Sequence, residues 1–251
     1  MGECRLGFSI LFALLIAART YAGGPVVYAV TSVNWEPYWL ISEQKIGGIL
    51  NDVMTELDRR IPHFLFASPD FPVKRSRLTF HNGGTIIECC INQDWREPYD
   101  SGGKTLWSDT VLMTEELLVF PKGGSFPVTR LEDLKGKSIA TILGYGYLGN
   151  DHFIRHDAMD NIAQLSMVAK KRTDAAIMDN YEYQYMLRNS SEVQNIADKI
   201  ETGPVINRTE LKMRIHSSRP DLVAPINSAI SKMKTDGTIK KIIFSYTYTN
   251  N

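Results

Sequence analysis

The segment Gly144–Gly149 has a spacing that could bind a charged group. It fits the pattern G-x-G-x-x-G, which in nucleotide-binding proteins presents backbone N–H groups to a phosphate. That interpretation needs an acidic residue about 20 positions further on, and position 164 is Gln. The N–H groups at the start of a following helix, predicted over 148–159, would instead hold a smaller anion such as a carboxylate. We therefore predict an anion site at the turn Gly144–Gly149.

Aromatic side chains cluster in residues 34–39, Asn-Trp-Glu-Pro-Tyr-Trp, directly after a predicted strand at 26–30. Core packing accounts for one of the three rings. Proteins with α/β folds bind ligands beyond the C-terminal ends of their strands, so the other rings are expected to form a wall for a small organic molecule. Arg96 follows the predicted strand 85–91 at the same edge, where it either contributes to this site or forms a surface salt bridge.

Motifs for catalysis or metal binding are scarce. The sequence contains no G-x-S-x-G elbow, no H-E-x-x-H and no P-loop. His152 and His156 are four apart in the predicted helix 148–159 and could face one metal ion, but no third ligand has a motif spacing, so exposed polar positions explain them better. Glu115 and Glu116 are consecutive and point apart on a strand. We expect no enzymatic activity, no cofactor and no metal.

The elements that position these residues alternate between strand and helix. A helix over 47–60 is predicted from apolar residues at helical spacing, and a second series of elements begins after residue 116. Further strands are predicted at 63–67, 117–120, 138–143, 175–178 and 211–215, and further helices at 180–187 and 220–234, followed by a terminal segment at 238–246. This alternation predicts an α/β protein with two units, in which the last segment returns to the first unit.

The overall charge and the N-terminus limit the class of protein. The 251 residues contain 28 Lys+Arg and 28 Asp+Glu, so the chain has no basic field with which to attract nucleic acid. Arg5 precedes an apolar run at 8–18, and a small residue follows at Ala22, which is the order of a cleaved signal peptide. The run is too short to span a bilayer. We expect residues 1–22 to be removed and the product to be a periplasmic monomer.

Export of the protein determines which cysteines remain and whether they can form a disulfide. Cys4 leaves with the signal peptide, so only Cys89 and Cys90 remain. Neighbouring cysteines rarely pair, because the ring that they close is small and distorts a trans peptide bond. Two buried free thiols on a strand are therefore expected, in a fold that is held together by its core.

Four motifs, taken in this order, resemble the bacterial periplasmic solute-binding proteins of family 3, the polar amino-acid-binding type. Residues 35–38 and 47–53 are similar to the family's "P-P-[FY] … G-[FI]-x-x-D-[LV]" start. Residues 131–137 match "L-x-D-L-x-G-K", the start of the second lobe, and 173–179 are similar to "x-D-A-x-x-x-D". Residues 236–239 resemble the closing "x-D-G-x-[IL]". The resemblance extends from about Val26 to Tyr246.

The resemblance implies a type 2 periplasmic-binding fold with two lobes, each a mixed sheet flanked by helices, and two crossover hinge strands. Lobe 1 would comprise 23–114 with 209–251, and lobe 2 would comprise 115–208. A ligand between the lobes would have its carboxylate held by an arginine and by backbone amides, its ammonium by an aspartate and its side chain by aromatic rings. By position, these roles fall on Arg96, Tyr145, Gly146, Tyr147, Asp179, Trp35 and Tyr38.

The implied function is capture of a small amino-acid-like or carboxylate ligand for an ABC permease in the inner membrane. Two alternatives remain open at this point. The same fold could serve as a sensory or orphan binding module without a transporter, or as an exported enzyme that uses the same cleft. The family's "G-x-x-D" is replaced by residues 82–85, Asn-Gly-Gly-Thr, and its Gly-Thr or Gly-Ser by Gly144-Tyr145. The fold is therefore better determined than the ligand.

Overall fold

The protein is an α/β molecule built on one eight-stranded sheet, in the order β4-β1-β5-β10-β6-β9-β7-β8. The computed structural model describes residues 25–30, 35–42, 45–67, 79–96 and 103–248, so the expected signal peptide at 1–22 lies outside the described residues. Strands β1, β4 and β5 are mutually parallel, as are β7, β8 and β9, whereas β10 and β6 run antiparallel to their neighbours. The predicted mixed sheets flanked by helices are confirmed.

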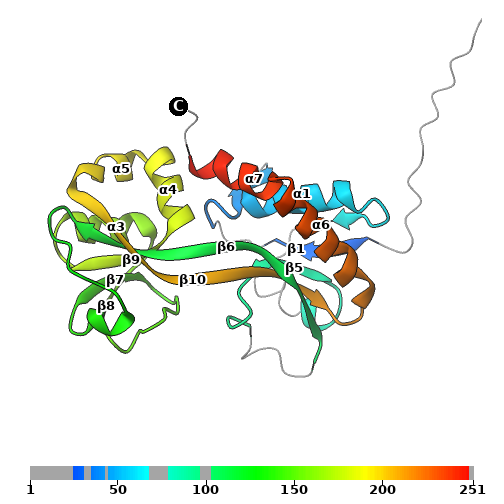
Figure 1. The fold of residues 1–251 in the computed structure, drawn as a ribbon, viewed down its shortest axis with the longest axis horizontal. Coiled ribbons are helices and arrows are strands. Elements are labelled where there is room, and N and C mark those ends of the chain that lie inside the picture. The colour runs from blue at the N-terminus through cyan, green and yellow to red at the C-terminus, as the bar shows by residue number, and fades with distance from the viewer. Residues whose placement is uncertain (1–24, 31–34, 43–44, 68–78, 97–102, 249–251) are drawn as a thin grey trace, which may run out of the picture.

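The elements form two groups, which we call lobe 1 and lobe 2 (Figure 1). Lobe 1 contains β1 (Val26–Ala29), β4 (Phe66–Ala67), β5 (Ile87–Ile91), the hairpin β2 (Leu40–Ser42) and β3 (Lys45–Gly47), α1 (Ile49–Arg60), α6 (Val223–Thr235) and α7 (Thr238–Thr247). Lobe 2 contains β7 (Ser138–Ile142), β8 (Ile154–Ala158), β9 (Ala175–Asp179), α3 (Asn161–Ala169), α4 (Asn180–Asn189) and α5 (Ser191–Gln194). The lobe bounds expected from the sequence stay a prediction.

Two strands of 17 residues each, β6 (Thr105–Pro121) and β10 (Ile200–His216), cross from one lobe to the other (Figure 1). They pair with each other along most of their length. At one end β10 pairs with β5 of lobe 1, and at the other end β6 pairs with β9 of lobe 2. The predicted strand 117–120 is therefore only the lobe 2 end of β6, and the predicted strand 211–215 is only the lobe 1 end of β10.

The start of α1 is held against the preceding aromatic segment. The N–H groups of Ile49 and Leu50 donate to the carbonyls of Pro37 and Tyr38, at 2.9 and 3.0 Å. Gly48 has φ +101°, and a Cβ at that position would lie 2.5 Å from the carbonyl oxygen of Tyr38. Only glycine tolerates both conditions, which is the physical reason for the glycine in the "G-[FI]-x-x-D" pattern. The apolar face of α1 then packs into the core of lobe 1.

The L-x-D-L-x-G-K motif forms the 3₁₀ helix Leu131–Leu134 and the turn into β7. The Asp133 carboxylate accepts hydrogen bonds from the backbone N–H groups of Thr129 and Arg130, at 2.8 and 3.1 Å. These bonds lower the pKa of Asp133. The motif thus ends the connection from β6 and starts the central strand of lobe 2.

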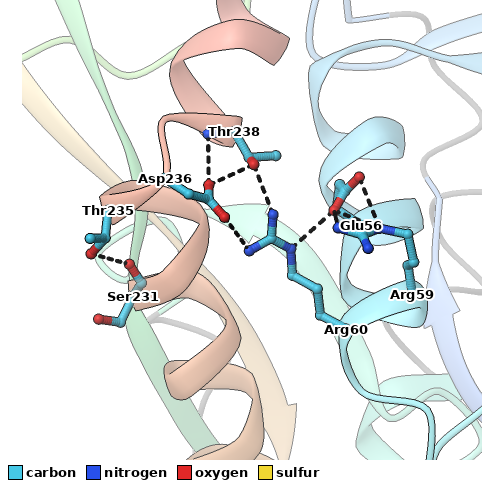
Figure 2. Close-up of polar contacts among 7 residues, drawn as sticks. All are labelled: Glu56, Arg59, Arg60, Ser231, Thr235, Asp236 and Thr238. Atoms are coloured by element: carbon cyan, nitrogen blue, oxygen red, sulfur yellow. Dashed lines mark hydrogen bonds and ion pairs between the residues drawn. The ribbon is translucent and has the colours of Figure 1, made fainter.

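A polar network joins α1 to the turn between α6 and α7 (Figure 2). Arg60 donates to Asp236 at 2.7 Å and to Thr238 at 2.8 Å, and also forms an ion pair with Glu56 on its own helix at 3.0 Å. Hydrogen bonds from Thr238 and Arg60 lower the pKa of Asp236 to about 2. Gly237, at φ +76°, lets the chain bend between the end of α6 and the start of α7. The closing D-G motif is therefore an anchor between helices of lobe 1.

We expect Arg60→Ala to lower the melting temperature by on the order of 2 °C. The matched control is Arg59→Ala, because Arg59 also pairs with Glu56 but its side chain is 64% exposed, against 14% for Arg60. Differential scanning calorimetry of both variants measures the difference. Equal melting temperatures in the two variants would show that the bridge from Arg60 to Asp236 and Thr238 adds nothing.

The predicted helix at 148–159 is wrong. Residues 154–158 form β8, which pairs in parallel with β7, and the helix of this region is α3, which begins after Asp160. Asp160 accepts a hydrogen bond from the N–H of Ala163 at 2.7 Å and so provides the N-cap. The residues of β8 are mostly polar because the strand lies at the edge of the sheet, and this polarity concealed it in the sequence.

The prediction of free thiols is also wrong. Cys89 and Cys90 are joined by a disulfide, within the fully buried strand β5. The prediction assumed a trans peptide, in which adjacent Cα atoms lie about 3.8 Å apart. The Cys89–Cys90 peptide bond is cis and the two Cα atoms are 3.0 Å apart, so the sulfur atoms can reach each other. A disulfide between neighbours links no separate elements, so the fold is still held by its core.

Candidate functional site at the lobe interface

Side chains of the two lobes meet where β1 and β9 end. Tyr38 comes from the turn before α1, and its phenol donates to the Asp179 carboxylate of lobe 2 at 2.8 Å. The same phenol lies 2.8 Å from the Thr114 hydroxyl of β6, which also bonds to Asp179. Tyr38 is completely buried. This contact joins lobe 1, a crossing strand and lobe 2 at one point.

The turn that carries Tyr38 is fixed by its own backbone. Trp35 and Trp39 exchange two backbone hydrogen bonds, at 2.8 and 2.9 Å, and the indole N–H of Trp39 donates to the carbonyl of Cys89 at 3.2 Å. The ring of Trp35 stacks on that of Tyr38 with centroids 4.2 Å apart. Trp39 and Tyr38 are both buried in the core of lobe 1, and Trp35 packs against that core. Trp35 and Tyr38 also carry the hydrogen bonds to lobe 2, and the wall that they would form for a ligand stays a prediction.

Asp179 ends β9 and provides the N-cap of α4. Its Oδ1 accepts the backbone N–H groups of Tyr181 and Glu182, at 2.9 and 3.0 Å. Burial raises the pKa of this carboxyl group, while the hydrogen bonds from Thr114 and from the helix amides act in the opposite direction. Asp179 thus positions the first turn of α4 and also accepts the bonds from lobe 1.

Glu182 is a site residue that the sequence interpretation missed. It lies in the first turn of α4, three residues after Asp179, and is only 7% exposed. Its carboxylate accepts the indole N–H of Trp35 across the interface at 2.7 Å, and the side-chain amide of Asn161 at 2.6 Å. The signal for it was available, because the residue three positions after a helix-capping aspartate lies on the same side of the helix.

These acidic groups affect one another. Burial, and next the charge of Asp179, raise the pKa of Glu182 to about 8. Glu116 of β6 pairs with Asp179 in the sheet, and burial raises its pKa too. We call Trp35, Tyr38, Thr114, Asp179 and Glu182 the interlobe cluster. It combines aromatic rings with carboxyl groups that hold protons more tightly than ordinary acids do.

Arg96 lies at the predicted edge but its guanidinium is bound to another residue. Its Nε lies 3.1 and 3.2 Å from the two carboxylate oxygens of Glu88, and its Nη2 also donates to Glu88. Arg214 of β10 binds the same carboxylate at 3.3 Å. In this structure Arg96 therefore forms an ion pair within lobe 1, and its side chain is not part of the interlobe cluster.

The anion site predicted at Tyr145, Gly146 and Tyr147 does not have the expected form. The loop leads into strand β8 and not into a helix, so it presents no helix N–H groups, and the N–H of Tyr145 donates to the carbonyl of Ile142. The Tyr147 hydroxyl accepts the N–H of Ile142 at 3.0 Å. The side chain of Tyr145 is half exposed. What these three residues bind stays a prediction.

Arg155 organises this loop instead. It donates to the carbonyls of Tyr145 and Ile142, at 3.0 and 3.2 Å, and forms an ion pair with Asp157 at 2.6 Å. Its guanidinium also lies over the ring of Tyr147, 5.3 Å from the centroid. His156 belongs to strand β8, so the predicted helical spacing of the two histidines does not exist. In the described ranges, no three His, Cys, Asp or Glu side chains are grouped as metal ligands would be.

A cavity of about 690 Å³ lies beside the interface, between β6, the start of α4 and α7. It is lined mainly by apolar side chains, and Met113, Tyr181 and Phe244 are among them. None of the predicted site residues lines it. The interlobe cluster is instead a direct contact, in which side chains of one lobe bind those of the other.

Comparison with known sequences gives relatives that are named as amino-acid or cystine-binding proteins. The chain matches no family model. It is 23% identical over 241 residues to a putative amino-acid ABC transporter-binding protein, PatH, of Vibrio harveyi, with 92% of each chain covered. It is 22% identical over 129 residues to the L-cystine-binding protein TcyJ of Escherichia coli, which covers 48% of this chain and 46% of that one.

Solved structures agree with the sequence relatives. The L-cystine solute receptor of Neisseria gonorrhoeae, in its unliganded open conformation, superposes with a TM-score of 0.69 at 15% identity, covering 89% of this chain and 92% of that one. None of the helices in the described ranges has the length and apolarity that spanning a bilayer requires. The superposition on the solute receptor shows that the chain has the two-lobe, type 2 periplasmic-binding fold. Together with the sequence relatives, it confirms the resemblance to the amino-acid-binding proteins of ABC transporters.

Proposed function

We propose that this protein captures a small amino-acid-like solute between its lobes and delivers it to an ABC transporter. The observation that carries the proposal is the interlobe cluster, in which Tyr38 and Trp35 of one lobe bind Asp179 and Glu182 of the other. Ligands of α/β proteins bind at this kind of position, beyond the C-terminal ends of the strands. The names of the relatives support binding rather than catalysis.

The two lobes would close on the ligand by a hinge motion of β6 and β10. The hinge would lie near the lobe boundaries expected from the sequence, at residues 114–115 and 208–209. A ligand that contacts both lobes stabilises the closed state by its extra contacts there. The Trp35–Glu182 and Tyr38–Asp179 bonds occupy the same interface in this structure, so a ligand bound there would replace some of them. Export by the predicted signal peptide, residues 1–22, would place the protein where a permease of the inner membrane can be reached.

The test is to identify the ligand and to locate its site. We expect native mass spectrometry of the mature protein to show a co-purifying small molecule, and that molecule to raise the melting temperature of the stripped protein. Trp35→Ala should abolish the shift because it removes an interface ring. Arg59→Ala, on the exposed side of α1, should keep it.

Two results would contradict the proposal. One is the absence of any bound molecule together with no thermal shift across the amino acids. The other is conversion of the bound molecule into a product, because turnover would make the interlobe site catalytic.

A further inference from the structure

Among the described residues, no positively charged side chain is bonded to the Glu182 carboxylate. Its two oxygen atoms accept hydrogen bonds from an indole N–H and a side-chain amide, both of them neutral donors. Its described hydrogen bonds and ion pairs include no lysine, arginine or histidine. A buried carboxylate normally pairs with a positive group, because neutral donors return only part of the solvation that is lost on burial.

The neighbouring charges have the same sign as Glu182. Asp179 lies on the same helix turn and Glu116 on the adjacent strand, and both raise the pKa of Glu182. Two arginines described above are paired with other acids: Arg155 forms an ion pair with Asp157, and Arg96 forms one with Glu88. The interface therefore concentrates acidic groups without a counter-charge among the residues that the structure describes.

Aromatic rings surround the same position. Trp35 stacks on Tyr38, and Trp95 approaches Trp35 edge-on with centroids 6.3 Å apart. Tyr181 lies 6.3 Å from Tyr38 on the lobe 2 side. Ring faces attract positively charged nitrogen groups that come within about 6 Å of the ring centroid, and they do so independently of any carboxylate. Rings and acids thus favour the same ligand charge.

We propose that Glu182 is a specificity-determining residue of the interlobe site and selects a ligand whose side chain carries a positively charged ammonium or guanidinium group. The proposal rests on the proposed function. The cationic group of the ligand takes the place of the Trp35 N–H at the Glu182 carboxylate, while the rings of Trp35, Tyr38 and Trp95 face it. Trp35 is freed from this bond and packs on the ligand.

The test uses arginine, agmatine, citrulline and cystine as probes, with isothermal titration calorimetry of the wild type and of Glu182→Gln. Citrulline has the shape of arginine without its positive side chain, and agmatine is arginine without its carboxylate. We expect arginine or agmatine to bind the wild type at least about tenfold more tightly than citrulline does. Glu182→Gln should remove most of that preference while leaving the binding of citrulline unchanged.

Each result bears on a different claim. Equal affinities of arginine and citrulline for the wild type, or a preference for arginine that Glu182→Gln keeps, would overturn the specificity of Glu182 and leave the proposed function standing. Failure of all four probes, together with no co-purifying molecule, would overturn both. The variant Glu116→Gln is a second acidic-to-neutral change outside the contact with Trp35. If it abolished the preference equally, the general negative charge of the interface would be responsible, and the role assigned to Glu182 would be wrong.

Discussion

Replacing Asp179 with alanine is expected to lower the free energy of unfolding by about 2–3 kcal/mol. The substitution removes the N-cap of α4 and the acceptor that the buried Tyr38 phenol uses in lobe 2. Loss of the cap costs about 0.5–2 kcal/mol, and loss of a buried hydrogen-bond acceptor adds about 1–3 kcal/mol. Relief of the desolvation that raises the pKa of Asp179 offsets part of this total.

The matched control is Asp179→Asn. An asparagine side chain keeps one oxygen acceptor for the amides of Tyr181 and Glu182, and it is as good an N-cap as aspartate. We therefore expect urea denaturation at neutral pH to give the asparagine variant most of the wild-type stability. An equal loss in both variants would mean that the negative charge, rather than the acceptor geometry, holds the interface together.

The second large effect is on the pH dependence of stability, and it comes from Glu182. Its pKa of about 8 in the folded state lies above the ordinary value near 4.5, so between these two pH values the folded protein binds more protons than the unfolded chain. The free energy of unfolding then falls as pH rises, by at most about 1.4 kcal/mol per pH unit for this one group. Below pH 4.5 both states are protonated and the loss is absent.

Glu182→Gln should therefore be more stable than the wild type at pH 8 and close to it at pH 4, when both are unfolded with urea. The groups that face Glu182 are the carboxyls of Asp179 and Glu116, the indole of Trp35 and the amide of Asn161. All of them remain in the variant, so the difference between the two proteins isolates the proton of Glu182. A difference that does not change with pH would show that Glu182 is ionised throughout.

Local sequence patterns predicted most of the elements because these patterns depend on near neighbours. The helical spacing of apolar residues predicted α1, and the runs at 138–143 and 175–178 predicted β7 and β9. The helix predicted near 220–234 corresponds to α6. Each of these depends on side-chain periodicity or on a backbone angle that a single residue type favours.

The elements that were missed depend on partners distant in the sequence. Strand β8 has little apolar character of its own and forms because β7 offers an open edge. The single crossing strand from 105 to 121 is continuous because β10 pairs along it. The local residue pattern of β8 does not indicate that it pairs with β7, and that of β6 does not indicate that it pairs with β10.

The sequence by itself determined that this protein is an α/β molecule with two lobes, and that Trp35, Tyr38 and Asp179 belong to its interface. Only the tertiary structure decided which charges are available there. Arg96 forms an ion pair with Glu88, which Arg214 also binds, while the Glu182 carboxylate accepts the indole N–H of Trp35 across the interface. The physical reason is that the pairing of a charge depends on which side chains the fold brings within hydrogen-bond distance, and residues 35 and 182 are neighbours only after both lobes have formed.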